Sequence, residues 1–226
     1  MYVHNALPFC EHKFSFKEDK LLWVYQSIIG KLIKNSIKKA NKVIVQNEWM
    51  KDEIVNRVKV DGKKVQVNFP DVTILPDYKY TKPDKKVFFY PANSSKFKNH
   101  RVILDACIKL RTQGISDYSV VFTLRGDENP EIKDIYDKGI KLGLGFEWVG
   151  TLSREQVFEW YEKSILLFPS YIETVGLPIY EAIGVGCPVI VSNCRYVSKY
   201  ITEYKDVSFA RYNVVDDWVN NMRKYL

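Results

Sequence analysis

Apolar residues in the second half of the chain fall into short runs that are separated by longer stretches of mixed polarity. Short runs rich in Val, Ile and Phe are typical of buried strands, and the intervening stretches have the apolar spacing of helices. The predicted strands are residues 87–91, 119–124, 146–149, 165–168, 189–191 and 207–210. Their alternation with helices predicts a complete doubly wound parallel sheet in an α/β fold.

Residues that commonly begin or end helices lie between these predicted strands. Glycine is favoured just after a helix, Asn or Ser just before one, and Pro in its first turn. The signals are Gly114 after a helix over 101–113, Asn129 with Pro130 at the next start, Gly143 after that helix, and Ser153 with Gln156 as a capping box. Together with the strands, they predict one whole nucleotide-binding domain.

The first part of the chain has fewer predicted elements. Strands are expected near Tyr2, Val43 and Val65, with helices over residues 21–42 and 48–58. Three strands are too few for an independent doubly wound sheet. We therefore divide the chain into an incomplete Rossmann-like half, residues 1–80, and a complete domain, residues 81–226.

The positive charge of the chain is concentrated in one predicted helix. There are 34 Lys and Arg residues against 27 Asp and Glu residues, which gives a formal charge of +7. Within residues 21–42, apolar residues recur at helical spacing beside Lys31, Lys34, Lys38, Lys39 and Lys42. Such a basic amphipathic helix either contacts anionic lipid as a peripheral membrane element or is merely solvated, and both alternatives stay open. Because the charge is localised in this way, we expect no nucleic-acid partner.

Further features narrow the class of protein. No apolar run reaches the 18–20 or so residues that span a bilayer, and the first residues lack the charged-then-apolar order of a signal peptide. A cytoplasmic location is therefore expected. The four cysteines form no CxxC pair, so they are expected to be reduced, small hydrophobic residues, and no metal site is predicted. They are Cys10, Cys107, Cys187 and Cys194.

The sequence PSYIETVGLPIYEAIGVGCPVIVSN, residues 169–193, is the most informative part of the chain. It follows a predicted strand and is expected to form a loop, a helix and the next strand. Pro178 suits the first turn of that helix, and Gly184 and Gly186 are expected to mark its end. This arrangement places the loop at the carboxyl end of a strand, where doubly wound proteins bind ligands.

Two glutamates and three backbone amides of this loop have chemistry suited to a nucleotide sugar. Glu173 lies just beyond the strand, and the amides of Val175, Gly176 and Leu177 lie at a helix N-terminus, where they can face an anion or a sugar hydroxyl. Glu181 is expected in the first turn of the helix, where its carboxylate can accept two hydrogen bonds from the hydroxyls of a ribose.

A second motif, YPANSSKFKNHRVILDA at residues 90–106, runs from a predicted strand into a helix. Lys98 and the N-terminal amides that follow it can bind a diphosphate through charge and the helix dipole. In doubly wound sheets, ligands bind outside the carboxyl ends of the strands. The segments expected to gather there are residues 93–98, residues 125–129, Gly150 and Glu173.

These motifs together resemble a known family. The pattern of Glu, seven residues and Glu, with Gly-Leu-Pro inside it and Glu-Ala, Gly and Pro-Val after it, resembles the donor-sugar loop of the retaining glycosyltransferases of family four, which have the GT-B fold. The form PAN…KNH is similar to bacterial mannosyl-type transferases of surface-polysaccharide assembly. Family members carry an Arg and a Lys in this loop. Lys98 matches the lysine, whereas the nearest upstream basic residue is Lys96, so the expected arginine is absent.

The resemblance implies a function and a set of site residues. A hexosyltransferase of this kind moves a sugar from a GDP- or UDP-linked donor to a glycan or lipid-linked hydroxyl acceptor with retention, without a metal or cofactor, in O-antigen, capsule or lipopolysaccharide assembly. By resemblance, Lys98 stabilises the leaving diphosphate, Glu173 is a catalytic residue that holds the donor sugar, and Glu181 holds the ribose. His4 either contacts substrate from the opposite domain as a second catalytic residue or merely caps a strand end.

The resemblance also implies that residues 1–80 are the remnant of an acceptor domain, because relatives have several strand–helix units before this point. Two consequences compete. Either the chain is a fragment or truncated gene product whose donor domain folds while catalysis is lost, or a separate partner chain supplies the missing N-terminal half. The rival class is a non-catalytic nucleotide-sugar-binding subunit that needs a partner chain. A third, weaker alternative is a phosphorylase-like or epimerase-like enzyme with the same fold.

Overall fold

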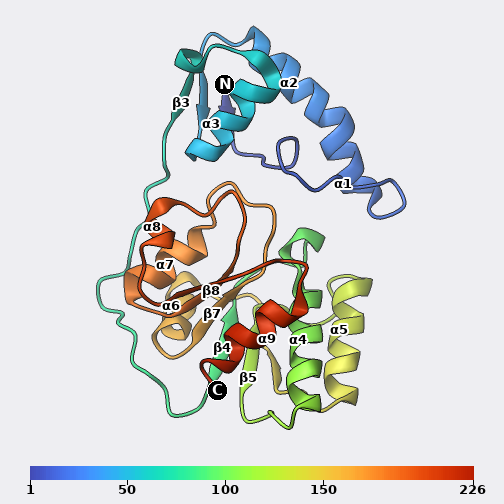
Figure 1. The fold of residues 1–226 in the computed structure, drawn as a ribbon, viewed down its shortest axis with the longest axis vertical. Coiled ribbons are helices and arrows are strands. Elements are labelled where there is room, and N and C mark those ends of the chain that lie inside the picture. Colours follow the sequence, from blue (N-terminus) through green and yellow to red (C-terminus); the bar gives the residue numbers. More distant parts are fainter. The chain divides into compact units, whose positions relative to one another are not determined.

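The computed structural model describes residues 1–226, and they form two compact units. Unit 1 comprises Met1–Asp71 together with Ile172–Gly176, and unit 2 comprises Val72–Tyr171 together with Leu177–Leu226. The elements of each unit can be followed by their labels in Figure 1. None of the helices combines the length and the apolar character that crossing a membrane requires.

Unit 1 is built on a three-stranded parallel sheet in the order β1-β2-β3. The strands are β1 (Tyr2–Val3), β2 (Val43–Val45) and β3 (Val65–Val67). The connection from β1 to β2 is a helical segment made of α1 (Lys20–Val24), the π-helical turn η1 (Tyr25–Ile29) and α2 (Gly30–Lys39). The connection from β2 to β3 contains α3 (Glu48–Ile54), η2 (Val55–Lys59) and η3 (Gly62–Lys64). All the elements expected in this part of the chain are present.

A buried glutamine orders the loop between β1 and α1. The Gln26 side-chain amide donates to the carbonyl oxygens of Leu7 at 3.1 Å and His12 at 2.7 Å, and its own oxygen accepts from the backbone N–H of Phe14 at 3.0 Å. A buried amide is costly unless it is bonded in this way. The inner face of the helical segment is therefore held against the loop by polar as well as apolar contacts.

Unit 2 contains a six-stranded, fully parallel sheet in the order β6-β5-β4-β7-β8-β9. The strands are β4 (Val87–Tyr90), β5 (Ser119–Phe122), β6 (Phe146–Trp148), β7 (Ile165–Phe168), β8 (Val189–Ser192) and β9 (Val207–Ala210). The chain builds outward from β4 to β6 and then from β7 to β9, so the order reverses between β4 and β7. The predicted doubly wound parallel sheet is confirmed.

Helices cover both faces of this sheet, as Figure 1 shows for α4 and α5 on one side and α6 and α7 on the other. The helices are α4 (His100–Thr112), α5 (Pro130–Lys141), α6 (Arg154–Glu162), α7 (Leu177–Val185), α8 (Lys199–Thr202) and α9 (Val215–Arg223). Since both faces are covered, the central strands are mostly apolar, and every residue of β5, β7 and β8 is buried.

The predicted helix boundaries are largely confirmed. The Asn129 side chain accepts from the N–H of Ile132 at 3.0 Å and caps α5, and Ser153 with Gln156 forms a capping box at α6. Gly184 and Gly186 were predicted to mark the end of α7, and the helix does end between them, with Gly186 following it at a φ of +88°, although Gly184 itself is the last but one residue of the helix. A Cβ on Gly184 would lie 2.4 Å from Cδ1 of Ile74, so glycine permits a close packing contact that sequence pattern does not reveal.

Residues 72–81 pack along unit 2, although the sequence division at residue 80 assigns most of them to the first domain. Tyr80 N–H donates to Val185 O at 2.9 Å and Thr81 N–H donates to Glu162 O at 2.8 Å. The guanidinium of Arg154 donates to Thr73 O at 2.5 Å. These bonds tie the segment to the ends of α6 and α7.

Candidate functional site

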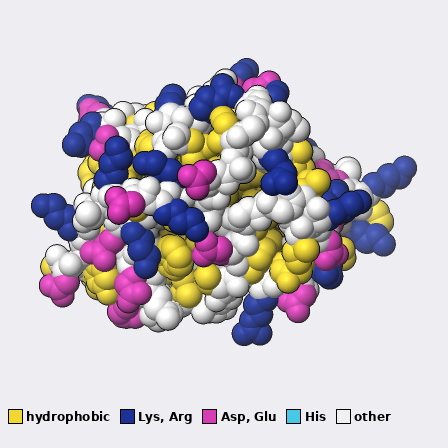
Figure 2. All heavy atoms as spheres, turned by 90° about the horizontal axis from the view of Figure 1, so that it is seen from below, with side chains coloured by type: hydrophobic (Ala, Val, Ile, Leu, Met, Phe, Trp, Pro, Cys, Tyr) yellow, Lys and Arg dark blue, Asp and Glu magenta, His cyan; other side chains and the backbone are white.

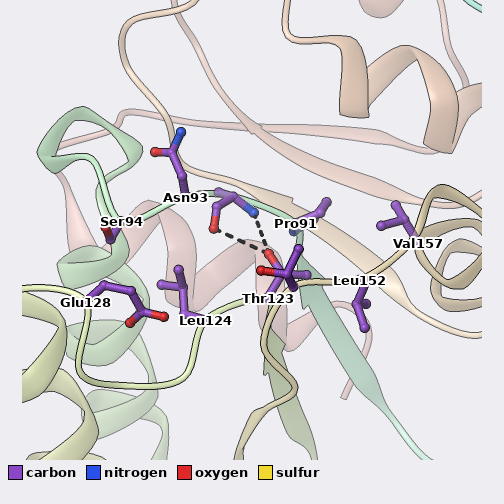
Figure 3. Close-up of a pocket in the computed structure, with 10 residues that line it drawn as sticks. Pro91, Asn93, Ser94, Thr123, Leu124, Glu128, Leu152 and Val157 are labelled. Carbon is purple, nitrogen blue, oxygen red and sulfur yellow. Dashed lines mark hydrogen bonds between the residues drawn. The ribbon is translucent and has the colours of Figure 1, made fainter.

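A cavity of about 450 Å³ opens at the carboxyl ends of β4, β5 and β6. It lies where parallel sheets of this type bind ligands. The residues that line it are Pro91, Ala92, Asn93, Ser94, Thr123, Leu124, Glu128, Thr151, Leu152 and Val157, most of which are labelled in Figure 3. Apolar side chains such as Leu124 and Leu152 alternate in this wall with hydroxyl, amide and carboxylate groups, a mixture suited to a planar ring that carries polar edges.

Hydrogen bonds between loops fix the shape of the cavity. The Thr123 hydroxyl accepts from Ala92 N–H at 3.0 Å, which joins the ends of β5 and β4 (Figure 3). The Asn129 side chain, which caps α5, also donates to Ser94 O at 2.8 Å. The cavity wall is therefore held by hydrogen bonds between side chains and backbone that do not involve a ligand.

Glu128 places a carboxylate in the cavity wall. Its oxygens accept from the N–H groups of Arg125 at 2.5 Å and Gly126 at 3.1 Å. Partial burial acts to raise the pKa of Glu128, but these and other backbone hydrogen bonds outweigh it and hold the pKa below its ordinary value. The cavity therefore contains a stable negative charge with lone pairs suited to N–H or O–H donors of a ligand.

Lys98 lies at the switch point of the sheet, where the strand order reverses between β4 and β7. It ends the short η4 turn (Lys96–Lys98), and its carbonyl oxygen accepts from the Tyr90 hydroxyl at 2.7 Å. Its ammonium nitrogen lies 5.8 Å from the ring centroid of Phe168, the last residue of β7. A cation at this position is suited to an anionic ligand group outside the carboxyl edge of the sheet.

Glu181 is paired with an arginine from a neighbouring helix. It is the fifth residue of α7, so it lies beyond the first turn in which it was predicted. Its Oε1 lies 2.9 Å from Nη2 of Arg154, and its Oε2 accepts from the Tyr161 hydroxyl at 3.4 Å. Burial raises the pKa of Glu181, while the charge of Arg154 and the bond from Tyr161 act in the opposite direction.

Comparison with protein families decides the class of this domain. Residues 77–226 match the family model of the glycosyl transferases group 1. The chain belongs to this family. A search of curated protein sequences found no match.

Solved structures with the same fold agree with this assignment to the group 1 glycosyl transferases. Sucrose-phosphate synthase from Thermosynechococcus elongatus is 17% identical, with a TM-score of 0.73 over 99% of this chain and 57% of its own. The Anabaena protein HepE, solved with UDP-glucose, is 13% identical, with a TM-score of 0.72 over 99% of this chain and 61% of its own. WaaG, a glycosyltransferase involved in lipopolysaccharide biosynthesis, is 17% identical, with a TM-score of 0.62 over 81% of this chain and 53% of its own.

The chain therefore spans between half and two thirds of the length of these three structures. Its fold is that of a GT-B glycosyltransferase, and the six-stranded sheet of unit 2 is consistent with the C-terminal half of that fold. The predicted fold class is thus confirmed.

The remaining residues predicted for the site divide between the two units of this glycosyl transferase chain. Glu173, Val175 and Gly176 belong to the segment Ile172–Gly176, which clusters with unit 1, where Trp49 Nε1 donates to Thr174 O at 2.9 Å. Leu177 begins α7 in unit 2 and is 39% exposed.

Glycine is needed at position 176, because its φ of +77° is strained for other residues. His4 is exposed in unit 1 directly after β1, with its ring centroid 5.9 Å from that of Tyr2. Lys98 and Glu181 are both in unit 2.

Asn99 is a site residue that the sequence analysis missed. It adopts a left-handed conformation with φ of +59°, which Asn tolerates better than most residues. Its side-chain amide donates to Tyr212 O at 2.8 Å and to Pro169 O at 3.3 Å. Asn99 therefore joins the Lys98 turn to the loops that follow β7 and β9.

Arg154 is the second residue that was missed. It occupies the first position of α6, where a charged residue is ordinary and carries no functional signal. Its relevance follows only from the tertiary contact with Glu181, since the two residues belong to different helices.

Proposed function

We propose that unit 2 binds the nucleoside diphosphate part of a GDP- or UDP-linked sugar, and that the protein transfers this sugar to a hydroxyl acceptor with retention at the anomeric carbon. The observation that carries the proposal is the coincidence of the cavity and the Lys98 ammonium at one carboxyl edge of a group 1 glycosyl transferase sheet. The HepE structure, which was solved with UDP-glucose, is a relative in fold that supports this ligand class.

The proposed roles follow from the chemistry of each group. The cavity volume of about 450 Å³ is within the usual range for small-molecule pockets, so it is suited to the base and ribose. Glu181 accepts hydrogen bonds from the ribose hydroxyls. Lys98 and helix-terminal amides stabilise the charge that develops on the leaving diphosphate, a preorganised contribution worth several kcal/mol in a closed site. In this assignment Lys98 and the helix-terminal amides neutralise the charge of the diphosphate, so that no metal ion is required.

Glu173 and the amides of Val175, Gly176 and Leu177 are proposed to hold the hydroxyls of the donor sugar, with His4 contacting the donor or acceptor. No arginine precedes Lys98 within its loop, and Lys96 is the nearest upstream cation for the diphosphate. We assign the activity to surface-polysaccharide or lipopolysaccharide assembly in the cytoplasm, a proposal that WaaG supports because it takes part in lipopolysaccharide biosynthesis.

A second candidate function is a non-catalytic nucleotide-sugar-binding subunit that acts with a partner chain. The observation that favours it is the small sheet of unit 1, which has only three strands. Glycosyl transfer requires the acceptor hydroxyl to be held against the anomeric carbon, and this positioning can account for about 7–11 kcal/mol of the barrier. A chain that lacks this positioning would bind the donor without rapid turnover.

Two measurements on the purified chain distinguish these candidates. Calorimetry with UDP and GDP tests donor binding, and incubation with radiolabelled nucleotide sugars and a lipid extract tests transfer. Binding with transfer supports the enzyme, and binding without transfer supports the subunit. If neither nucleotide binds, the donor site in unit 2 is misassigned and both candidates fail.

A further inference from the structure

The outer face of the helical segment 20–39 carries a row of exposed apolar side chains. Leu21, Tyr25, Ile28 and Leu32 are 65%, 39%, 51% and 61% exposed, respectively. Their spacing of four, three and four residues places them along one side of a helix, over a length of roughly 16 Å. The opposite side is buried against unit 1 through residues such as Gln26, Gly30 and Ile37. We call the exposed side the apolar row.

Only lysine contributes charge to this segment. Between positions 20 and 39 there are five lysines and no Asp or Glu. Lys20, Lys31, Lys38 and Lys39 are exposed, whereas Lys34 is half-buried with its ammonium 5.8 Å from the ring centroid of Phe9. By contrast, Figure 2 shows a face of the molecule on which Lys and Arg side chains lie among Asp and Glu side chains. The segment is thus both apolar and of a single charge sign.

Aromatic residues with a nearby cation lie at the start of the segment. Phe16 is 52% exposed, and its ring packs edge-on against Trp23 with centroids 5.5 Å apart. The Lys20 ammonium lies 5.3 Å from the centroid of the Phe16 ring. Aromatic residues next to cations are favoured at the boundary between lipid and water, because the ring enters the apolar region while the charge remains hydrated.

We propose that the apolar row of unit 1 lies on a membrane leaflet that contains anionic phospholipid. The four apolar side chains would enter the boundary of the acyl region, and the long stems of the lysines would let their ammonium groups reach the lipid phosphates. Lipid is favoured over a protein partner because the charged residues of the segment that carries the apolar row are all lysines. Such a surface complements a uniformly anionic one. This inference does not depend on the donor site, since it rests on unit 1 alone.

Vesicle sedimentation with the full 226-residue chain tests the proposal. Binding is measured with vesicles of phosphatidylcholine alone and with vesicles that also contain phosphatidylglycerol. We expect binding to the anionic vesicles, weak or no binding to the neutral ones, and loss of binding at high salt. The double variant Lys31→Gln/Lys38→Gln is expected to bind more weakly, by about fivefold for each lysine removed.

A matched control removes the same charge elsewhere. The variant Lys199→Gln/Lys205→Gln changes two lysines of unit 2 whose side chains are 86% and 85% exposed, and it should bind like the unaltered chain. The variant Ile28→Ser/Leu32→Ser removes apolar contact without altering charge. It should also lose binding, while its thermal unfolding stays unchanged because both side chains are exposed.

Three results would overturn the proposal. The first is no binding to anionic vesicles, and the second is an equal loss of binding in the control variant. The third is a concentration-dependent dimer, seen by analytical ultracentrifugation, that Ile28→Ser/Leu32→Ser abolishes while vesicle binding persists. In that case a second copy of the chain, and not lipid, covers the apolar row.

Discussion

The Arg154 guanidinium lies 2.9 Å from the Glu181 carboxylate and links it to the segment that enters unit 2, because the same guanidinium nitrogen donates to Thr73 O. Glu181 is largely buried, with 14% of its side chain exposed, and burial raises its pKa, while the charge of Arg154 and the bond from Tyr161 oppose this rise. The pair therefore orients the carboxylate and favours its ionised form in a position where burial favours the neutral form.

Replacing Glu181 by Ala is expected to weaken UDP or GDP binding by about 1–3 kcal/mol, because it removes hydrogen bonds between a charged group and the ribose. Isothermal titration calorimetry measures the change. Glu159→Ala is the matched control, since Glu159 is an exposed carboxylate on the neighbouring helix α6. Equal affinity in Glu181→Ala and the unaltered chain would remove Glu181 from the ribose site.

Replacing Arg154 by Ala should shift the pH dependence of nucleotide binding. Burial already raises the pKa of Glu181, and loss of the cation that opposes this effect raises it further. Binding requires the ionised carboxylate, so it falls as the pH drops through this pKa, and the midpoint of the fall should lie at higher pH in the variant. Arg154→Lys should retain a midpoint closer to that of the unaltered chain. Titration of affinity against pH is the measurement, and identical profiles for all three proteins would contradict a role for the pair.

Replacing Lys98 by Ala should lower the affinity for UDP but leave the much weaker affinity for uridine unchanged, because the ammonium interacts only with phosphate. The expected loss is about 1.5–3 kcal/mol, the size of a charge-assisted hydrogen bond. Lys141→Ala, on the exposed end of α5, controls for the change in net charge. A parallel loss for UDP and uridine would instead mean that the loop had collapsed.

Replacing Asn99 by Ala should destabilise unit 2 by about 2 kcal/mol, since it removes the bonds to Tyr212 O and Pro169 O and leaves a strained positive φ. Asn99→Gly relieves the strain but does not restore the lost bonds. Its free energy of unfolding should therefore lie between those of the unaltered chain and Asn99→Ala. Denaturant unfolding gives the free energies. If Asn99→Gly were less stable than Asn99→Ala, backbone strain would have no part in the role of this residue.

His100 should make the stability of the protein sensitive to acid. Burial, followed by the charge of Lys98, lowers its pKa to about 3, whereas an unfolded histidine titrates near 6.5. Between these values the unfolded chain binds a proton that the folded chain does not, so the free energy of unfolding falls as pH drops, by up to about 1.4 kcal/mol per pH unit. This fall should level off near pH 3.

The variant His100→Phe should lose this fall in the free energy of unfolding at low pH, whereas the variant His4→Gln, which changes an exposed histidine, should keep it. Unfolding of the three proteins between pH 7 and pH 4 is the comparison. An unchanged pH slope in His100→Phe would mean that His100 is protonated in the folded chain.

The sheet of unit 2 was predictable because its strands are local features of the sequence. Residues 165–168 and 207–210 form strands with the predicted bounds, and the first of these runs is apolar throughout, as expected of a parallel strand covered on both faces. Capping was predictable for a similar reason, because Ser153 and Gln156 make their contacts within a single turn of chain.

The contacts that define the site were not predictable in the same way. Arg154 and Glu181 are 27 positions apart, and Asn99 bonds to Tyr212 from 113 positions away. Hydropathy and capping patterns report only on residues that are close in sequence, so they cannot predict such pairs. Gly184 shows the same limit: its place near the end of α7 was predicted, but the close contact with the side chain of Ile74, which is distant in sequence, was not.

Tyr90 performs two tasks through the two ends of one side chain. Its ring is fully buried beside Phe168, while its hydroxyl donates to the carbonyl of Lys98. Substitutions that repack the interior of the sheet around this ring would therefore move the Lys98 turn as well. A substitution at Tyr90 therefore changes stability and ligand affinity together. Only a residue with both an aromatic ring and a terminal hydrogen-bond donor would leave both properties unaltered.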